Sequence, residues 1–219
     1  MLPTSLLTQA MIAYEDDFLL ILDKPAGMLV HPTVSECGTT LYDYVKGYFA
    51  AKGLQADIHP VSRLDRNTSG LVIFAKEPVV QFWLSQQEVT KEYLALACGH
   101  VEEQQGIIDA PIARKEGSII ERCVDFARGK QAKTAYEVLD YYGANTLLKV
   151  RLYTGRTHQI RVHLAYIGHP LVQDNLYGVP GPQSRHTLHA YRLAFKHPVS
   201  DDALEITRGL PEDFLKMLY

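Results

Sequence analysis

A run of five apolar residues at positions 71–75 follows a polar segment at residues 59–70, and it constrains the fold more than any other stretch. An apolar run bounded by turn-forming residues is typical of a buried strand. Asp65 lies on the polar loop that leads into this strand, between Arg63 and Arg66. Neighbouring guanidinium groups favour an ionised carboxylate, which makes Asp65 a candidate nucleophile or base. Local composition alone favours a plainer interpretation, in which these polar residues satisfy the backbone of a turn.

The size of the chain and its cysteines narrow the class of protein. With 219 residues and 47% hydrophobic side chains, it can bury a substantial core as one large domain or two small ones. No apolar run has the length of a membrane span, and the N-terminus lacks the basic region of a signal peptide. The cysteines are scattered and odd in number: Cys37, Cys98 and Cys123. They argue against a disulfide framework and a zinc site, and they fit a reducing cytoplasm.

The charges are unevenly distributed along the chain. The net charge of −3 argues by itself against a nucleic-acid partner. Residues 1–60 carry three basic and seven acidic side chains, whereas residues 141–200 carry seven basic side chains and the single acid Asp174. A local basic surface is what a phosphate backbone recognises, so the second segment is a candidate nucleic-acid surface. The alternative is a solvated surface whose acids lie elsewhere in the chain.

Hydrophobic periodicity predicts most of the regular structure. Strands are predicted at residues 11–14, 18–22, 71–75, 91–101, 134–140, 147–153, 188–195 and 204–207. Helices are predicted at residues 41–49, 77–89, 159–167 and 211–218. Residues 106–133 are less regular, with short extended pieces separated by glycine and proline. They carry six basic side chains, which indicates either an arm that contacts a polyanion or a charged hairpin. Because the chain has no internal repeat and no low-complexity linker, one domain over residues 1–219 is the simpler assignment.

Capping residues define two of these helices. Thr39 or Thr40 can cap the start of the first helix, and Gly53 can end it. Thr157 is a good N-cap for the helix at residues 159–167, and Gly168 is in place to terminate it. Arg161 then falls in the first helical turn, where its side chain can point toward a cleft.

Several common catalytic and cofactor motifs are absent from the sequence. The histidines invite a metal site, but there is no HExxH motif and no carboxylate at ligand spacing within residues 156–169. The chain also lacks a GxSxG nucleophile motif and the Gly-rich loops that bind phosphates or dinucleotides. We therefore expect no metal ion, no nucleotide and no redox cofactor.

Five segments of the chain match one known family in the family's own order. SRLDRNTSG at residues 62–70 resembles the HRLDxxTSG signature of the RluA-type pseudouridine synthases. KPAG at residues 24–27 is similar to the family's KPxG segment, and KEYLA at residues 91–95 to its KxYxA segment. GRTHQIRVH at residues 155–163 and GHPLVQDNLYG at residues 168–178 resemble two further segments. One such match would be weak, whereas five in order over most of the chain are highly specific.

The resemblance implies a fold and a reaction. The fold would be α+β, with a mixed, largely antiparallel central sheet, flanking helices and a central RNA-binding cleft. The reaction would convert uridine in RNA to pseudouridine without a cofactor, which agrees with the missing motifs. Asp65 would be the essential carboxylate, as nucleophile at the sugar or as base, and both roles stay open. Arg161 matches the basic residue that pairs with this aspartate, and Tyr93 matches the tyrosine that stacks on the uracil and assists proton transfer.

The resemblance also implies how RNA would be held. The target base must leave its stack, at a cost of a few kcal/mol. Arg63 matches the arginine that moves into the vacated space, and Ile160 can pack against the flipped ring. Further candidates for contact with RNA are Lys24, Arg156 and His158. The expected partner is ribosomal or transfer RNA, with no membrane, and the expected protein is a cytoplasmic monomer.

Two features limit what the resemblance implies. The KPxG segment begins at Lys24, so we expect no accessory RNA-binding domain before the catalytic one. Ser62 stands where the family usually has histidine, although a serine can still form a hydrogen bond and we expect catalysis to survive. This departure leaves a second hypothesis, a non-catalytic RNA-binding protein on a synthase scaffold. A third hypothesis, a metal-dependent hydrolase, predicts inactivation by chelators, to which an isomerase of this kind should be indifferent.

Overall fold

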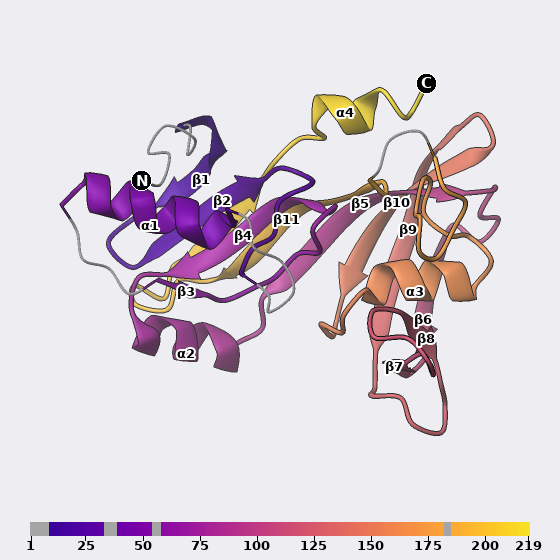
Figure 1. Ribbon diagram of the computed structural model, residues 1–219, viewed down its shortest axis with the longest axis horizontal. Helices are drawn as coiled ribbons and strands as arrows, with labels where there is room; N and C mark the ends of the chain where they lie inside the picture. Colours follow the sequence, from indigo (N-terminus) through magenta and orange to yellow (C-terminus); the bar gives the residue numbers. More distant parts are fainter. Residues whose placement is uncertain (1–8, 33–38, 54–57, 182–184) are drawn as a thin grey trace. The chain divides into compact units, whose positions relative to one another are not determined.

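The computed structural model describes residues 9–32, 39–53, 58–181 and 185–219, and Cys37 lies outside them. Contacts within the chain define two compact units (Figure 1). The first unit comprises Met1–Val89 and Ala190–Arg208, and the second comprises Thr90–His189 and Gly209–Tyr219. A single functional domain over the whole chain therefore stays a prediction, since the chain divides into two compact bodies.

The first unit is built on a sheet with the predicted buried strand near its centre. Its main strands, in spatial order, are β1 (Ile12–Glu15), β2 (Leu19–Lys24), β4 (Ser69–Ala75) and β11 (Leu188–Lys196). Two further strands extend it: β3 (His59–Pro60) pairs with β4, and β12 (Ala203–Thr207) pairs with β11. The pairings of β1 with β2, β2 with β4, β3 with β4 and β11 with β12 are antiparallel. The helical elements are η1 (Gln9–Met11), α1 (Leu41–Ala51) and α2 (Pro78–Gln86).

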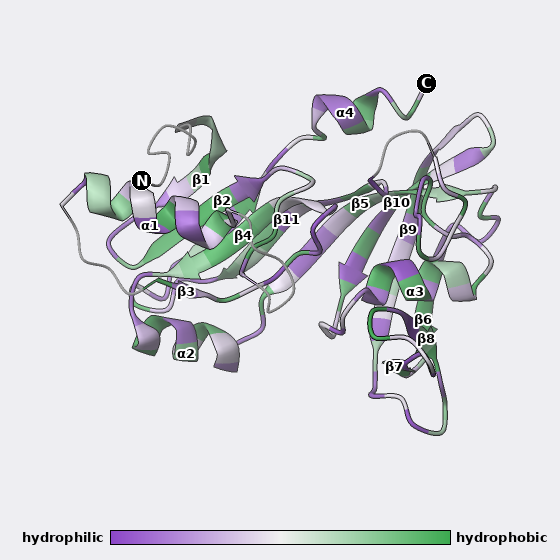
Figure 2. Cartoon of the chain, in the orientation of Figure 1, coloured by the Kyte–Doolittle hydropathy of each residue, from purple (hydrophilic) through white to green (hydrophobic). Residues whose placement is uncertain are grey.

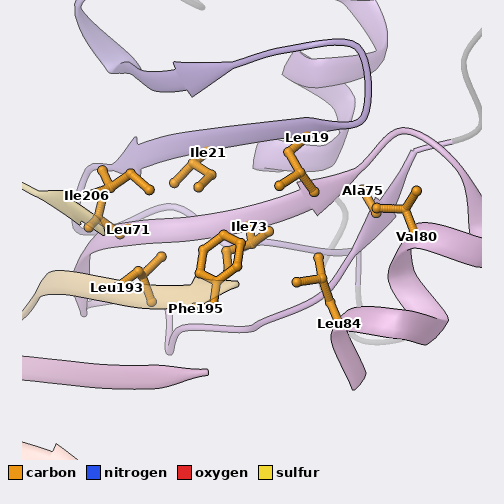
Figure 3. Close-up of a cluster of buried hydrophobic side chains, with 10 residues drawn as sticks. All are labelled: Leu19, Ile21, Leu71, Ile73, Ala75, Val80, Leu84, Leu193, Phe195 and Ile206. Atoms are coloured by element: carbon orange, nitrogen blue, oxygen red, sulfur yellow. The ribbon is translucent and has the colours of Figure 1, made fainter. Parts of the chain in front are cut away.

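Strands β2 and β4 are buried on both faces, which explains why they lack polar alternation (Figure 2). On one face, α2 packs against the two strands and β11 (Figure 3). That cluster consists of Leu19, Ile21, Leu71, Ile73, Ala75, Val80, Leu84, Leu193, Phe195 and Ile206. On the other face, Leu41, Val45 and Phe49 of α1 pack against Leu20 and Phe74. Each fully buried side chain of this size contributes roughly 1.5–3 kcal/mol, so the polar loop before β4 is attached to a rigid support.

The ends of α1 and α2 follow the capping chemistry of the sequence. Thr40 is the N-cap of α1 in a capping box, in which the Asp43 carboxylate accepts a hydrogen bond from the Thr40 amide at 2.9 Å. Gly53, with φ of 70°, lies directly after the C-cap Lys52. Helix α2 has Pro78 in its first turn, where a missing amide hydrogen costs nothing.

The second unit contains four consecutive strands of the large sheet and a short two-stranded sheet. The four strands pair in the antiparallel order β5 (Thr90–Cys98), β10 (Asn145–Leu152), β9 (Lys133–Tyr142) and β6 (Gln105–Asp109). Strands β7 (Ile112–Arg114) and β8 (Arg122–Val124) form an antiparallel hairpin within the irregular region. Its helices are α3 (Gln159–Tyr166) and α4 (Glu212–Leu215). Largely antiparallel sheets with few helices confirm the predicted α+β fold class.

The structure corrects one predicted helix cap and contains one strand that the sequence did not predict. The N-cap of α3 is His158, with a left-handed φ of 59°, whereas Thr157 is exposed and lies outside the helix. Strand β3 was not predicted, because two residues are too short for a periodic signal. Helix α4 is also shorter than predicted. None of the helices that the structure describes is long and apolar enough to span a membrane.

Candidate active site

The turn that carries Asp65 is closed by a hydrogen bond of its own backbone and fixed by hydrogen bonds from a distant loop. The Thr68 amide donates to the Asp65 carbonyl at 3.1 Å, and β4 begins at the next residue, Ser69. The Arg66 carbonyl accepts two hydrogen bonds from a distant loop, from the Gly27 amide at 2.9 Å and from Lys24 Nζ at 3.0 Å. The half-buried Asp65 therefore lies on a turn whose next residue is fixed by two donors.

Lys24 requires a correction of its predicted role. Its side chain is fully buried, and Nζ also donates to the carbonyls of Pro25 and Met28, both at 2.8 Å. Burying an ammonium group is costly unless hydrogen bonds compensate it, and these carbonyls supply them. A phosphate group cannot reach a side chain in this position. Lys24 holds the Asp65 turn instead of contacting RNA.

Arg63 is exposed, as contact with RNA would require. Its positive charge affects the pKa of His31, which lies in the same unit. Burial of the ring, together with the Arg63 guanidinium, lowers the pKa of His31 below its ordinary value of 6.5. The stem of the Asp65 loop thus presents a permanent positive charge beside a histidine that favours its neutral form.

The structure gives Ser62 a defined role. The Val61 amide donates to the Ile73 carbonyl at 2.9 Å, which continues the pairing of β3 with β4 by one residue. The Ile73 amide then donates to Ser62 Oγ at 3.2 Å. A side-chain oxygen thereby accepts from a strand amide just before the chain turns toward Asp65.

The glycine of the TSG segment is required by close packing. Gly70 has φ of 113°, and a Cβ atom built on it would lie 2.3 Å from the Ala190 carbonyl oxygen. Any side chain here would push β11 away from β4. The Asp65 turn is therefore fixed at its end as well as at its middle.

In the second unit, Gln159 fixes the start of α3. Its Oε1 accepts from the Arg156 amide at 2.9 Å and from Thr154 Oγ1 at 2.8 Å. Its Nε2 donates to the Lys133 carbonyl at 3.0 Å and to Thr134 Oγ1 at 2.9 Å. Gln159, the first helical residue, thus joins α3 to β9 and to the preceding loop. It makes the capping contacts that were expected of Thr157.

One turn later, His163 joins α3 to the same strand. The ring is fully buried, with Nδ1 2.9 Å from Thr134 Oγ1 and Nε2 2.9 Å from the Ala110 carbonyl. Because a carbonyl only accepts, Nε2 carries the hydrogen and Nδ1 accepts from the threonine. Burial lowers the pKa of His163 below its ordinary value of 6.5, so the ring is neutral at pH 7. Within the described part of the chain, no group of three or more His, Cys, Asp or Glu residues could hold a metal ion.

Arg161 forms a buried two-point ion pair. Its Nε donates to Asp174 Oδ2 and its Nη2 to Asp174 Oδ1, each at 2.7 Å. Asp174 is fully buried, and its Oδ1 also accepts from the amides of Leu176 and Tyr177. Burial would raise the pKa of Asp174, but the hydrogen bonds and charge of Arg161 outweigh it and hold the pKa below the ordinary value. Asp174 is therefore a partner of Arg161 that the sequence did not identify, while the pairing of Arg161 with Asp65 stays a prediction.

Tyr177 completes this group of side chains. The Arg161 guanidinium lies over its ring, 4.9 Å from the centroid, and its hydroxyl lies 2.7 Å from His158 Nδ1. The hydroxyl also accepts from the Arg122 amide, at 2.8 Å. The predicted RNA-binding residue His158 is thus attached through Tyr177 to the face of Arg161.

The other predicted residues of this unit lie on separate elements. Tyr93 is buried on β5, directly opposite Val150 of β10. Ile160 is buried at the start of α3, beside Arg161. Arg156 is exposed in the loop before α3, and its Nε donates to the Gln131 carbonyl at 2.9 Å.

Most of the basic side chains at residues 141–200 have acidic partners. The ion pairs are Lys149–Glu137, Arg161–Asp174, Arg185–Asp213, Arg192–Glu205 and Lys196–Asp201. Apart from Asp174, these acids lie outside the segment. A surface ion pair changes stability little, but it does offset the charge that a phosphate would meet. The excess of basic residues in this part of the sequence therefore overstates the positive charge that it presents.

The sequence alone does not identify Gln159, Asp174 and Tyr177 as supporting residues. All three lie inside segments that resemble the family, GRTHQIRVH and GHPLVQDNLYG. Their position in these segments was the only available signal. Their roles depend on contacts such as those of Gln159 with Thr134 and of Tyr177 with Arg122, 25 and 55 residues apart in the sequence, which no local pattern encodes.

Comparison with known proteins identifies the family of the chain. Residues 18–166 match the model of the RNA pseudouridylate synthase family. The chain is 40% identical to ribosomal large subunit pseudouridine synthase D of Nitrosomonas europaea, over 94% of this chain and 64% of that protein. It is 35% identical to the uncharacterized RNA pseudouridine synthase YjbO of Bacillus subtilis, over 94% of this chain and 75% of that protein. The chain thus spans just under two thirds of the length of the first of these relatives and three quarters of the second.

A solved structure supports the same assignment. The fold is similar to that of human RNA pseudouridylate synthase domain containing 1, with a TM-score of 0.75 and 27% identity. The similarity covers 95% of this chain and 85% of the human one. The match to the family model covers parts of both compact units, including all of β4 and α3. By sequence and by fold, this chain belongs to the RNA pseudouridylate synthase family.

Proposed function

We propose that this protein is an isomerase that converts uridine in RNA to pseudouridine, with Asp65 as its essential carboxylate. The observation that carries the proposal is the fixed Asp65 turn. Buried Lys24 and the Gly27 amide hold the Arg66 carbonyl, and β4 anchors the end of the turn. A reacting group must be held in one geometry for efficient catalysis, and this turn has the necessary support. Membership of the family supports the type of reaction.

The reaction needs no oxidant, reductant or second substrate. The bond between ribose C1′ and uracil N1 breaks, the base turns, and C1′ becomes bonded to uracil C5. The hydrogen on C5 leaves as a proton and N1 gains one, so atoms and electrons balance. Asp65 can begin this sequence by attacking C1′ or by taking a proton from the sugar. Both routes require the ionised carboxylate.

The second unit supplies the remaining proposed catalytic residues. We assign to Tyr93 the stacking of the uracil and assistance in proton transfer, and to Ile160 packing against the flipped ring. Arg161 would provide positive charge for the Asp65 carboxylate. Its two-point pairing with Asp174 supports this role, because it fixes the plane of the guanidinium and keeps the group oriented.

The residues proposed to hold the RNA are mainly exposed. Arg63 would occupy the space left by the flipped base, and Arg156 and His158 would contact the strand near it. Arg114 and Lys130, on the β7–β8 hairpin and just after it, are exposed and have no ion-pair partner in the described chain. They favour the first of the two interpretations of this region, an arm that contacts a polyanion.

The names of the relatives suggest the substrate. Two of the most similar proteins are named as ribosomal large subunit synthases, so we propose large-subunit ribosomal RNA as the substrate and transfer RNA as the alternative. We further propose that the protein acts as a monomer in the cytoplasm, where these RNAs are found.

The test compares RNA from a strain that lacks the protein before and after incubation with it. Mapping pseudouridine at single-nucleotide resolution should reveal one or more new sites in ribosomal RNA, made by the wild-type protein but not by Asp65→Asn. New sites in transfer RNA alone would replace the ribosomal assignment. RNA binding without a new site would favour the rival hypothesis of a non-catalytic RNA-binding protein.

A further inference from the structure

We infer that Tyr177 is a positioning residue that couples the β7–β8 hairpin to Arg161. The inference rests on the proposed function, because it concerns how RNA contact at the hairpin would reach a catalytic side chain. All residues involved belong to the second compact unit.

The phenol of Tyr177 joins two segments through one oxygen atom. It accepts a hydrogen bond from the amide of Arg122, the first residue of β8, at 2.8 Å. It also lies 2.7 Å from Nδ1 of His158. A phenol that accepts from an amide retains its own hydrogen, which it can donate to a neutral imidazole. The Tyr177 hydroxyl thus contacts both the hairpin and the N-cap of α3.

The ring of Tyr177 limits a movement of the Arg161 guanidinium that Asp174 does not limit. Asp174 holds the guanidinium edge through two hydrogen bonds at 2.7 Å, which fixes its plane. The tyrosine ring lies against the guanidinium, 4.9 Å from centroid to Cζ, which limits movement out of that plane. Since Asp174 also binds the Tyr177 amide, ring and carboxylate move as one support.

His158 is held in a backbone conformation that needs outside support. Its φ of 59° is left-handed, and for a residue other than glycine this costs on the order of 1–3 kcal/mol. The hydroxyl of Tyr177 and the edge-to-face contact of the two rings provide such support. Arg161 lies three residues further along the same helix start, so a change at His158 alters the direction from which Arg161 emerges.

The hairpin end of this connection is suited to sensing a ligand. Ile119 and Phe126, at the tip and just past the hairpin, are 82% and 71% exposed. Arg114 lies directly opposite Arg122 in the β7–β8 register. At its base, Ile112 and Val124 pack with Val162 of α3, and Tyr177 packs against the same cluster. RNA that binds these exposed residues would therefore shift β8, whose Arg122 amide donates a hydrogen bond to the Tyr177 hydroxyl.

The first test removes only the hydroxyl. Tyr177→Phe keeps the ring against Arg161 but releases the Arg122 amide and His158. We expect kcat to fall about tenfold, within the usual range of coupling between sites, with thermal unfolding still cooperative. Tyr166→Phe is the matched control, because Tyr166 is exposed on α3 and should retain wild-type kcat. A kcat for Tyr177→Phe within twofold of wild type would overturn the inference.

The second test asks whether hairpin and tyrosine act through one connection. Arg114→Ala should lower kcat in the wild-type background and leave it unchanged in the Tyr177→Phe background. Effects that multiply would mean that Tyr177 is merely structural, and would overturn the coupling.

A further variant keeps the inference testable should Tyr177→Phe fold poorly. His158→Gly removes the ring contact while suiting a left-handed φ, so a purely structural role predicts unchanged or higher stability. Because His158 is also proposed to contact RNA, kcat is measured at saturating RNA, where loss of that contact raises only KM. Coupling predicts a lower kcat without loss of stability, and an unchanged kcat would contradict it. If the wild-type protein forms no pseudouridine, the proposed function fails; if it is active and these variants match it, the coupling alone fails.

Discussion

At the scale of single residues, buried charges determine how the two proposed catalytic groups are held. Lys24 donates to three carbonyls in the first unit, and Arg161 pairs with buried Asp174 in the second. Neither charge is available as a free surface group. Removing one partner of a buried pair leaves the other charge uncompensated, so stability and activity are linked at these positions.

Variants of the Arg161–Asp174 pair can separate the effect on stability from the effect on activity. Arg161→Met should lower the free energy of unfolding by about 3–5 kcal/mol, because it leaves the Asp174 carboxylate buried and uncompensated. Adding Asp174→Asn should recover a large part of that loss, since a neutral amide still accepts from the Leu176 and Tyr177 amides. Urea unfolding measures both changes, and turnover should stay very low in both variants. Recovery of turnover in the double variant would show that Arg161 acts only as structural support.

At the scale of the elements, the sequence predicted the supports of the site better than the contacts that complete it. Strand β4 and helices α1 and α2 follow from apolar runs, a threonine cap and a proline, all of which are local signals. Helix α3 begins at residue 159 as predicted, but its predicted N-cap was wrong, because Gln159, inside the helix, makes the capping contacts expected of Thr157. The Ser62 contact could not be predicted either, because its partner lies eleven residues away on β4.

The role of Ser62 leads to a prediction about the stem of the Asp65 loop. Ser62→Ala would leave the Ile73 amide without its acceptor, and we expect a loss of about 1–3 kcal/mol in the free energy of unfolding. Ser62→Thr keeps the hydroxyl and should retain most of the stability. Ser200→Ala, at an exposed position in the same unit, is the matched control. Equal stability of Ser62→Ala and the wild type in urea unfolding would show that this hydrogen bond contributes nothing.

At the scale of the whole molecule, the chain is two compact units that the family model matches together. The first unit holds Asp65 and Arg63, and the second holds Tyr93, Ile160 and Arg161. Five ordered motifs indicated the family from the sequence alone, and the comparisons confirm that assignment. The division into two units was not predicted, because neither a linker nor a change of composition marks it in the sequence.

The stability of the second unit should depend on pH through His163. Burial lowers the pKa of His163 in the folded state. Below about pH 6.5 the unfolded chain therefore binds a proton at this histidine more readily than the folded protein does. The contribution of the neutral ring is present above that pH and is lost as pH falls below it, at up to about 1.4 kcal/mol per pH unit. Urea unfolding between pH 7.5 and 5 should show a shallower decline for His163→Gln than for the wild type. Parallel declines would contradict this assignment.

The release of hydrogen from uracil C5 tests the central claim most directly. Joining C1′ to C5 expels that hydrogen, so RNA labelled with tritium at uridine C5 should release tritium to water as pseudouridine forms. We predict release by the wild-type protein and by Asp17→Asn, a matched change at an exposed acid of the first unit. We predict no release above background by Asp65→Asn, with RNA affinity and thermal unfolding close to wild type. Tritium release by Asp65→Asn at the wild-type rate would contradict the assignment of Asp65 as the catalytic carboxylate.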